Sequence, residues 1–220
     1  MSLTTSTPAP TPTDDDMAAA LTAFTWFLGR AAIDGIELTS AGYLKPADVE
    51  AASEVVPAMR DWPGKNNREN LARPLLHFRK ALQQVGLLRK NKDRLQLTRA
   101  GSSASRDPRA LWNHLATRIG KPAQDRFEQE LSLLLLAYAA SSRDGSLPVD
   151  SIAWALDRIG WKNHDRRPIE GYQVYHYAPL PLEILMNVDG PDAPRSTRRT
   201  LSPAAIALAR TALFSGSGRV

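Results

Sequence analysis

The stretch PLLHFRKALQQVGLLRKNKDRLQLTRAG, residues 74–101, decides the fold. Its first half carries one apolar stripe, with residues three and four positions apart at Leu75, Phe78, Leu82 and Val85. This spacing predicts an amphipathic helix that starts near Pro74 and stops at Gly86. Two short apolar runs follow on either side of the turn-prone residues 91–93. They predict a two-stranded hairpin directly behind the helix.

The end of this stretch, LTRAG at residues 97–101, repeats the phrase LTSAG at residues 38–42. In each copy we expect the Leu to be the last inward residue of a strand. The Thr hydroxyl can cap the amides that follow, and the Gly permits a tight backbone. The phrase therefore predicts two strand-to-helix junctions.

The neighbouring segments extend this pattern in both directions. Upstream, Asp16 can cap a helix, residues 36–38 suit a brief strand, and Pro46 suits the start of a second helix. Downstream, Asp107 precedes a proline in a helix-starting position. Helix, short connection, helix, hairpin and helix are the parts of a winged helix in outline.

The second half of the chain shows a similar order of parts. Apolar residues at helical spacing predict a long helix over residues 127–138 and a short helix over residues 152–159. Glu183–Asn187 is a strand candidate, and residues 189–197 would be a wing. Ser202 can cap a last helix. We therefore expect a mainly α fold of tandem winged-helix-like units, in which helices alternate with short two-stranded β-hairpins. The expected divisions are a disordered tail at 1–16, an N-terminal helical unit at 17–122 with its winged-helix core at 60–122, a second winged-helix-like unit at 123–214 and a flexible C-terminus at 215–220.

Five phrases of the sequence carry a family resemblance: LTSAGYLKPADVEA (38–51), NREN (67–70), PLLHFRKALQQVGLLRK (74–90), RLQLTRAG (94–101) and DPRALWNHLA (107–116). They resemble the helical C-terminal region of actinobacterial proteins whose N-terminal part is a plasmid open-reading-frame-three-like domain. The similarity runs from about residue 17 to 214 and is most specific between 36 and 119. That family is uncharacterised, so the resemblance implies an architecture and no active site.

Charge is distributed unevenly along the 220 residues. Residues 1–59 carry two Lys or Arg against eight Asp or Glu, residues 60–99 carry eleven against three, and the remainder carries fifteen against twelve. The net charges of these segments are therefore −6, +8 and +3. A concentrated basic block predicts a surface for a polyanion, although basic faces also serve solubility.

Within the basic block, the predicted helix and hairpin carry cations that can face the same side. In a winged helix the third helix enters the DNA major groove and the wing reaches phosphates. The expected contacts with double-stranded DNA are Arg73, His77, Lys80, Gln84, Arg89, Lys90, Lys92 and Arg94. A protein–protein interaction or assembly module, or a homodimer, uses the same scaffold and remains the competing function.

Motifs for chemistry are missing from the sequence. It contains no cysteine, its four histidines lack metal-ligand spacing, and no phosphate loop or nucleophile elbow is present. The longest apolar run, residues 131–140, is about half of a bilayer span. We therefore expect a non-enzymatic cytoplasmic protein with no cofactor, no metal and no membrane association.

Three features leave alternatives open. Trp62, in a turn-rich loop, is either a lid on the core or an anchor for a partner. Residues 161–177, with His164, Asp165, Glu170 and His176, form either a structural loop or a site. Near the second predicted wing, Arg195, Arg198 and Arg199 are either a weaker basic surface or an exposed segment.

Overall fold

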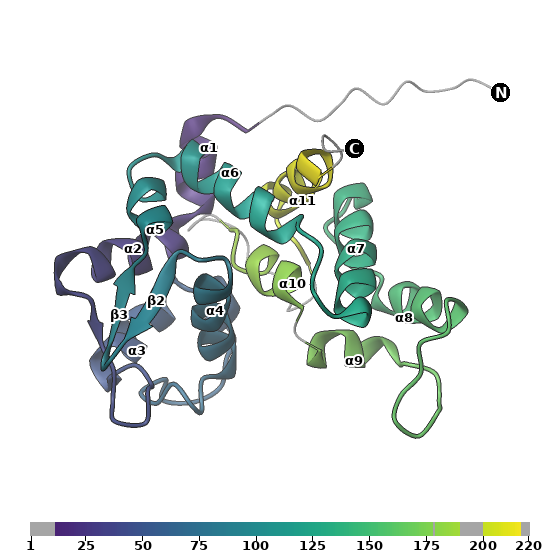
Figure 1. The fold of residues 1–220 in the computed structure, drawn as a ribbon, viewed down its shortest axis with the longest axis horizontal. Helices are drawn as coiled ribbons and strands as arrows, with labels where there is room; N and C mark the ends of the chain where they lie inside the picture. The colour runs from purple at the N-terminus through teal and green to yellow at the C-terminus, as the bar shows by residue number, and fades with distance from the viewer. Residues whose placement is uncertain (1–11, 178, 190–199, 217–220) are drawn as a thin grey trace.

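The computed structural model describes residues 12–177, 179–189 and 200–216. In this part of the chain the fold is mainly helical, with one small antiparallel sheet of three strands. Figure 1 shows the sheet at one end of the molecule and α7, α8 and α9 at the other, with α6, α10 and α11 between them. Within these ranges, no helix combines the length and the apolar character that crossing a bilayer requires.

The sheet and the helices around it come from the first hundred residues. In chain order the elements are α1 (Asp14–Ala20), α2 (Thr22–Asp34), β1 (Ile36–Glu37), α3 (Pro46–Val55), the 3-10 turn η1 (Pro57–Met59), α4 (Arg73–Gln84), β2 (Leu88–Asn91) and β3 (Arg94–Leu97). Helix α1 begins inside the predicted tail, because Thr13 and Asp16 form a reciprocal capping box there. The cap is therefore Thr13, and the prediction of Asp16 as the cap is wrong.

Helix α4 and the hairpin form where the sequence predicts them. Leu75, Phe78 and Leu82 are buried, and the helix closes with the Leu87 amide donating to the Leu82 carbonyl. Gly86 permits this ending because its φ of 77° lies in the left-handed region. The chain continues into β2 and reverses at Lys92, whose φ is 54°.

The strand order is β1-β3-β2, and both neighbouring pairs are antiparallel. Ile36 of β1 faces Leu95 of β3, and Leu88 of β2 faces Leu97. Residues 17–59 therefore supply the outer strand of the sheet that the hairpin builds.

The two copies of the repeated phrase are both junctions after a strand, but their glycines differ. Thr98 caps the next helix by accepting from the Gly101 amide at 2.9 Å, and a Cβ on Gly101 would collide with the Leu87 carbonyl. In the first copy the Tyr43 amide donates to the Thr39 hydroxyl at 3.1 Å, and Gly42 has a φ of 81°. One glycine allows a close approach between backbones and the other allows a turn.

The helices after the hairpin are α5 (Arg99–Ala104), α6 (Pro108–Ile119), α7 (Arg126–Ser141), α8 (Val149–Arg158), α9 (Gly171–His176), α10 (Leu180–Leu185) and α11 (Pro203–Gly216). Among them, α11 packs against α6 and α7, and α8 packs against α7 and α9. Asp107 and Ser202 cap α6 and α11 as predicted. Buried residues from both halves, including Phe24, Trp112 and Leu135, belong to one continuous core.

The second half differs from the predicted repeat. Glu183–Asn187 is not a strand, because Glu183 to Leu185 end helix α10 and the chain then turns. The run is short and apolar, so its periodicity does not separate strand from helix, whereas Pro179 and Pro181 at the start favour a helix. From residue 123 onward the described residues contain single β-bridges and no two-stranded hairpin. Apart from Asp189, the predicted second wing lies outside the described residues.

Candidate nucleic-acid interface

The hairpin places three cations on its exposed side. Arg89 and Lys90 belong to β2, and Lys92 occupies the turn. All three side chains are exposed, and within the described part of the chain none forms an ion pair or a hydrogen bond with another residue. The ammonium of Lys90 lies over Gly42, where a side chain would displace it. Three solvated positive charges are thus held within four residues.

The C-terminal half of α4 adds a smaller polar contribution. Lys80 and Gln84 are exposed, on the face opposite the buried Leu75 and Phe78. The helix contacts β2, and three residues separate its C-terminal end from the start of that strand.

The N-terminal half of α4 faces another part of the molecule. His77 lies 3.4 Å from Glu183 of α10, measured from Nδ1 to Oε1, and Arg73 is exposed one helical turn earlier. The predicted DNA contacts of α4, from Arg73 to Gln84, therefore do not share one environment. The first half of the helix faces α10, and its second half leads into the hairpin.

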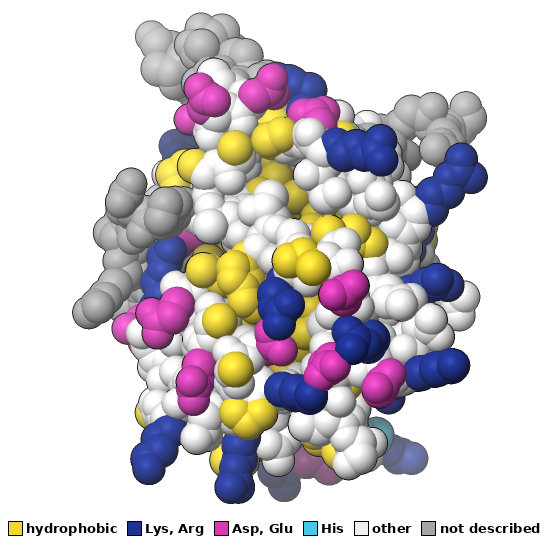
Figure 2. All heavy atoms as spheres, turned by 90° about the vertical axis from the view of Figure 1, so that its left-hand side faces the viewer, with side chains coloured by type: hydrophobic (Ala, Val, Ile, Leu, Met, Phe, Trp, Pro, Cys, Tyr) yellow, Lys and Arg dark blue, Asp and Glu magenta, His cyan; other side chains and the backbone are white. Residues whose placement is uncertain are grey.

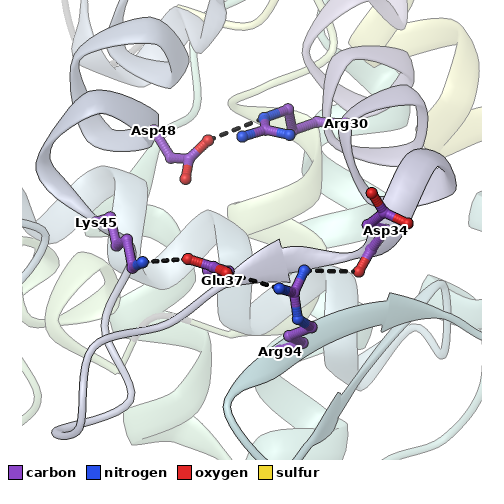
Figure 3. A network of polar contacts seen from close by, with 6 residues as sticks. All are labelled: Arg30, Asp34, Glu37, Lys45, Asp48 and Arg94. Atoms are coloured by element: carbon purple, nitrogen blue, oxygen red, sulfur yellow. Dashed lines mark hydrogen bonds and ion pairs between the residues drawn. The ribbon is translucent and has the colours of Figure 1, made fainter.

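Arg94 differs from the other hairpin cations because it is neutralised within the fold (Figure 3). Its guanidinium donates to Glu37 at 2.6 Å and to the Asp34 carbonyl at 2.9 Å. Glu37 also binds Lys45, and Arg30 pairs with Asp48 nearby at 3.0 Å. The β1 edge of the sheet is therefore a network in which the positive groups shown have acidic partners.

This network lowers the pKa of Glu37, its central carboxylate. The Lys45 ammonium, hydrogen-bonded to Glu37, together with the Arg94 guanidinium holds the pKa of Glu37 below its usual value. Glu37 stays ionised at neutral pH, so Arg94 keeps its partner.

Arg79, on the same helix, is buried and does not belong to the exposed surface. It donates to Glu69 at 2.6 and 3.2 Å and to Gln83 at 2.9 Å, and Glu69 also accepts from the Leu44 amide at 2.7 Å. This pair ties α4 to the β1–α3 connection. The apolar stripe alone could not reveal it, because Glu69 lies outside the helix.

The surface over the first half combines these features. In Figure 2, Lys and Arg side chains project from the lower edge of the face shown, whereas its centre mixes both signs with apolar groups between them. Further Lys and Arg side chains lie along the right-hand edge of this face.

Two other candidates from the sequence, Trp62 and the segment 161–177, form contacts within the fold. Trp62 packs against the core and donates to the Leu71 carbonyl at 3.2 Å. In the segment 161–177, Trp161 donates to Glu130 at 2.6 Å, Glu170 caps α9, and Asn163 bonds Gln173 at 3.0 Å. These contacts support the structural interpretation of that loop. Arg195, Arg198 and Arg199 lie outside the described residues.

The described ranges contain no cluster of three or more His, Asp or Glu side chains placed to hold a metal ion. No family model matches the chain, and neither the curated proteins nor the solved structures contain a match. The resemblance inferred from residues 38–116 therefore stays a prediction, and the function must be argued from the geometry.

Proposed function

We propose that this chain binds double-stranded DNA through the hairpin and the C-terminal half of α4. In this proposal α2, β1, α3, α4, β2 and β3 form a winged helix, with α4 as its third helix and the hairpin as its wing. The order of elements and the β1-β3-β2 sheet support this assignment.

The observation that carries the proposal is the difference between Arg94 and its neighbours. Among the described residues, Arg89, Lys90 and Lys92 have no acidic partner, although the same sheet neutralises Arg94 with Glu37. Cations held close together without partners can bind phosphates without first losing an internal ion pair.

The proposed contacts are with the DNA backbone and carry no sequence preference by themselves. Because His77 pairs with Glu183, the first turns of α4 are not assigned to base edges. We assign the approach to the groove to Lys80 and Gln84, because both side chains are exposed.

Fluorescence anisotropy of a labelled 20-base-pair duplex tests this proposal at low salt. The variant Arg89→Ala/Lys90→Ala/Lys92→Ala should bind about 100-fold more weakly than the unmodified chain. The matched control Arg106→Ala/Lys121→Ala/Arg143→Ala removes the same charge from exposed positions elsewhere and should change affinity less than about threefold. Equal losses in both variants would contradict the proposed surface.

A protein-interaction function is the second candidate. Leu133 of α7 and Phe214 of α11 are 59% and 78% exposed, on helices that pack against each other. Light scattering after size-exclusion chromatography tests it: a dimer that Leu133→Gln/Phe214→Gln converts to a monomer would support this candidate, and a monomer throughout would remove homodimerisation.

A further inference from the structure

A cavity of about 510 Å³ lies between the first and second halves of the chain. One wall comes from η1, the turn after it and the first turns of α4. The other comes from α9, α10, the residues after α10 and the start of the chain's last segment. The volume falls within the range of small-molecule sites in proteins.

The walls are mostly apolar, with aromatic side chains at several positions. Trp62 lines one side, and Tyr172 and Tyr175 line the opposite side. Leu182, Leu185 and Met186 complete the apolar surface. Such a lining accommodates a flat hydrocarbon ring, because aromatic rings pack favourably against one another and against aliphatic groups.

An ion pair and a histidine–carboxylate contact connect the walls. Arg60 binds Asp189 at 2.7 Å, and His77 faces Glu183 at 3.4 Å. Both contacts join the first half of the chain to the second, so they hold the two walls together, and the Arg60–Asp189 pair neutralises two charges at the cavity.

The positive groups on the α4 side of the cavity are the guanidinium of Arg73 and the start of the helix. Arg73 has no acidic partner in the described residues and stands one turn before His77 on the same face of the helix. The start of α4 has no side-chain cap, since its N-cap position is Ala72. A helix N-terminus carries partial positive charge, which adds to that of Arg73. Three carboxylates also line the cavity: Asp189 pairs with Arg60, Glu183 faces His77, and Asp61 lies in the exposed turn after η1.

We propose that this cavity binds a small aromatic carboxylate, with its ring between the apolar walls and its anionic group against Arg73 and the start of α4. His176, which also lines the cavity, supplies a further hydrogen-bonding group. This site is separate from the hairpin surface, and its occupation does not depend on DNA binding.

Isothermal titration calorimetry with 2-naphthoate, in the absence of DNA, tests the assignment. We expect saturable one-to-one binding in the micromolar to low millimolar range. The neutral isostere 2-naphthamide and the cation 2-naphthylmethylammonium should each bind at least about 10-fold more weakly. Equal binding of the amide would overturn the anionic assignment, and the absence of binding at 5 mM naphthoate would overturn the site.

Two variants and a matched control locate the ligand. Arg73→Gln should weaken naphthoate binding about 10-fold, whereas Lys80→Gln removes the same charge from the same helix outside the cavity and should leave it within twofold. Met186→Trp should abolish binding by filling the cavity, with circular dichroism confirming that the variant is folded. Unchanged affinity in Arg73→Gln or in folded Met186→Trp would place the ligand elsewhere and overturn the proposal. If Met186→Trp does not fold, Arg73→Gln against Lys80→Gln decides.

Discussion

The two edges of the small sheet use cations in opposite ways. At the β1 edge, Arg94 and Lys45 share Glu37, and Arg30 pairs with Asp48 (Figure 3). At the β2 edge, Arg89 and Lys90 have no acidic partner in the described part of the chain. The local density of Lys and Arg is high in the hairpin as a whole. A cation is therefore available to a ligand when no carboxylate lies beside it, and the number of positive residues alone does not decide this.

The largest effect is expected where a cation is both partnered and buried. Glu69→Ala leaves Arg79 buried without its carboxylate and should lower the free energy of unfolding by about 3–5 kcal/mol. Urea denaturation followed by circular dichroism measures this. Glu50→Ala, at an exposed position of α3, is the control and should cost little. A loss below about 1 kcal/mol for Glu69→Ala would show that the pair contributes little to the fold.

The second largest effect is expected from adding an acidic partner for Arg89 at the β2 edge. Gln96 lies directly opposite Arg89 in the ladder, so Gln96→Glu places a carboxylate beside that guanidinium. DNA affinity at low salt should fall about 10-fold, because Arg89 is neutralised and the new charge repels phosphate. Gln96→Met removes the polar group without adding charge and should change affinity less than threefold. Equal affinities of the two variants in anisotropy titrations would argue against phosphate contact at this edge.

A smaller effect is expected from the neutralised cation. Arg94→Ala should change DNA affinity less than about twofold, since its guanidinium already binds Glu37 and the Asp34 carbonyl. The unfolding midpoint of Arg94→Ala in urea should decrease because the ion pair with Glu37 is lost. The decrease should be modest because this ion pair is partly exposed. Anisotropy and urea titrations of the same preparation separate the two outcomes. A loss of affinity as large as that of the hairpin triple variant would remove the distinction between the two edges.

The smallest effect concerns pH. The folded pKa of Glu37 lies below its usual value of 4.5, so its contribution to stability is present above that value and is lost as pH falls through the folded pKa. Glu37→Gln should therefore be less stable than the unmodified chain at pH 7, and the difference should shrink as pH falls below about 4.5. Urea midpoints between pH 7 and pH 3 measure this, with Glu50→Gln as the control. A difference that stays constant with pH would assign the loss to packing.

Local patterns in the sequence predict the local structure well. The apolar stripe of α4, the stop at Gly86 and the cap at Thr98 all depend on residues a few positions apart, and the structure confirms each. The strand at Glu183–Asn187 was predicted wrongly because a short apolar run suits either a strand or a buried helix.

The candidate site was predicted less completely because its electrostatics depend on distant residues. Glu37 lies 57 positions from Arg94, and Glu183 lies more than a hundred from His77. No local spacing indicates such pairs. The sequence therefore located the basic hairpin correctly in the chain, but could not separate its available cations from Arg94 or foresee that Arg79 is buried.

The salt dependence of DNA affinity tests the central claim most directly, because each phosphate contact contributes about one unit to the slope of log K against log salt. Anisotropy titrations between 50 and 200 mM NaCl should give a slope that is shallower by about three units for Arg89→Ala/Lys90→Ala/Lys92→Ala. The slope of the matched triple variant at Arg106, Lys121 and Arg143 should equal that of the unmodified chain. Equal slopes for all three proteins, or no binding to DNA at 50 mM NaCl, would contradict the account.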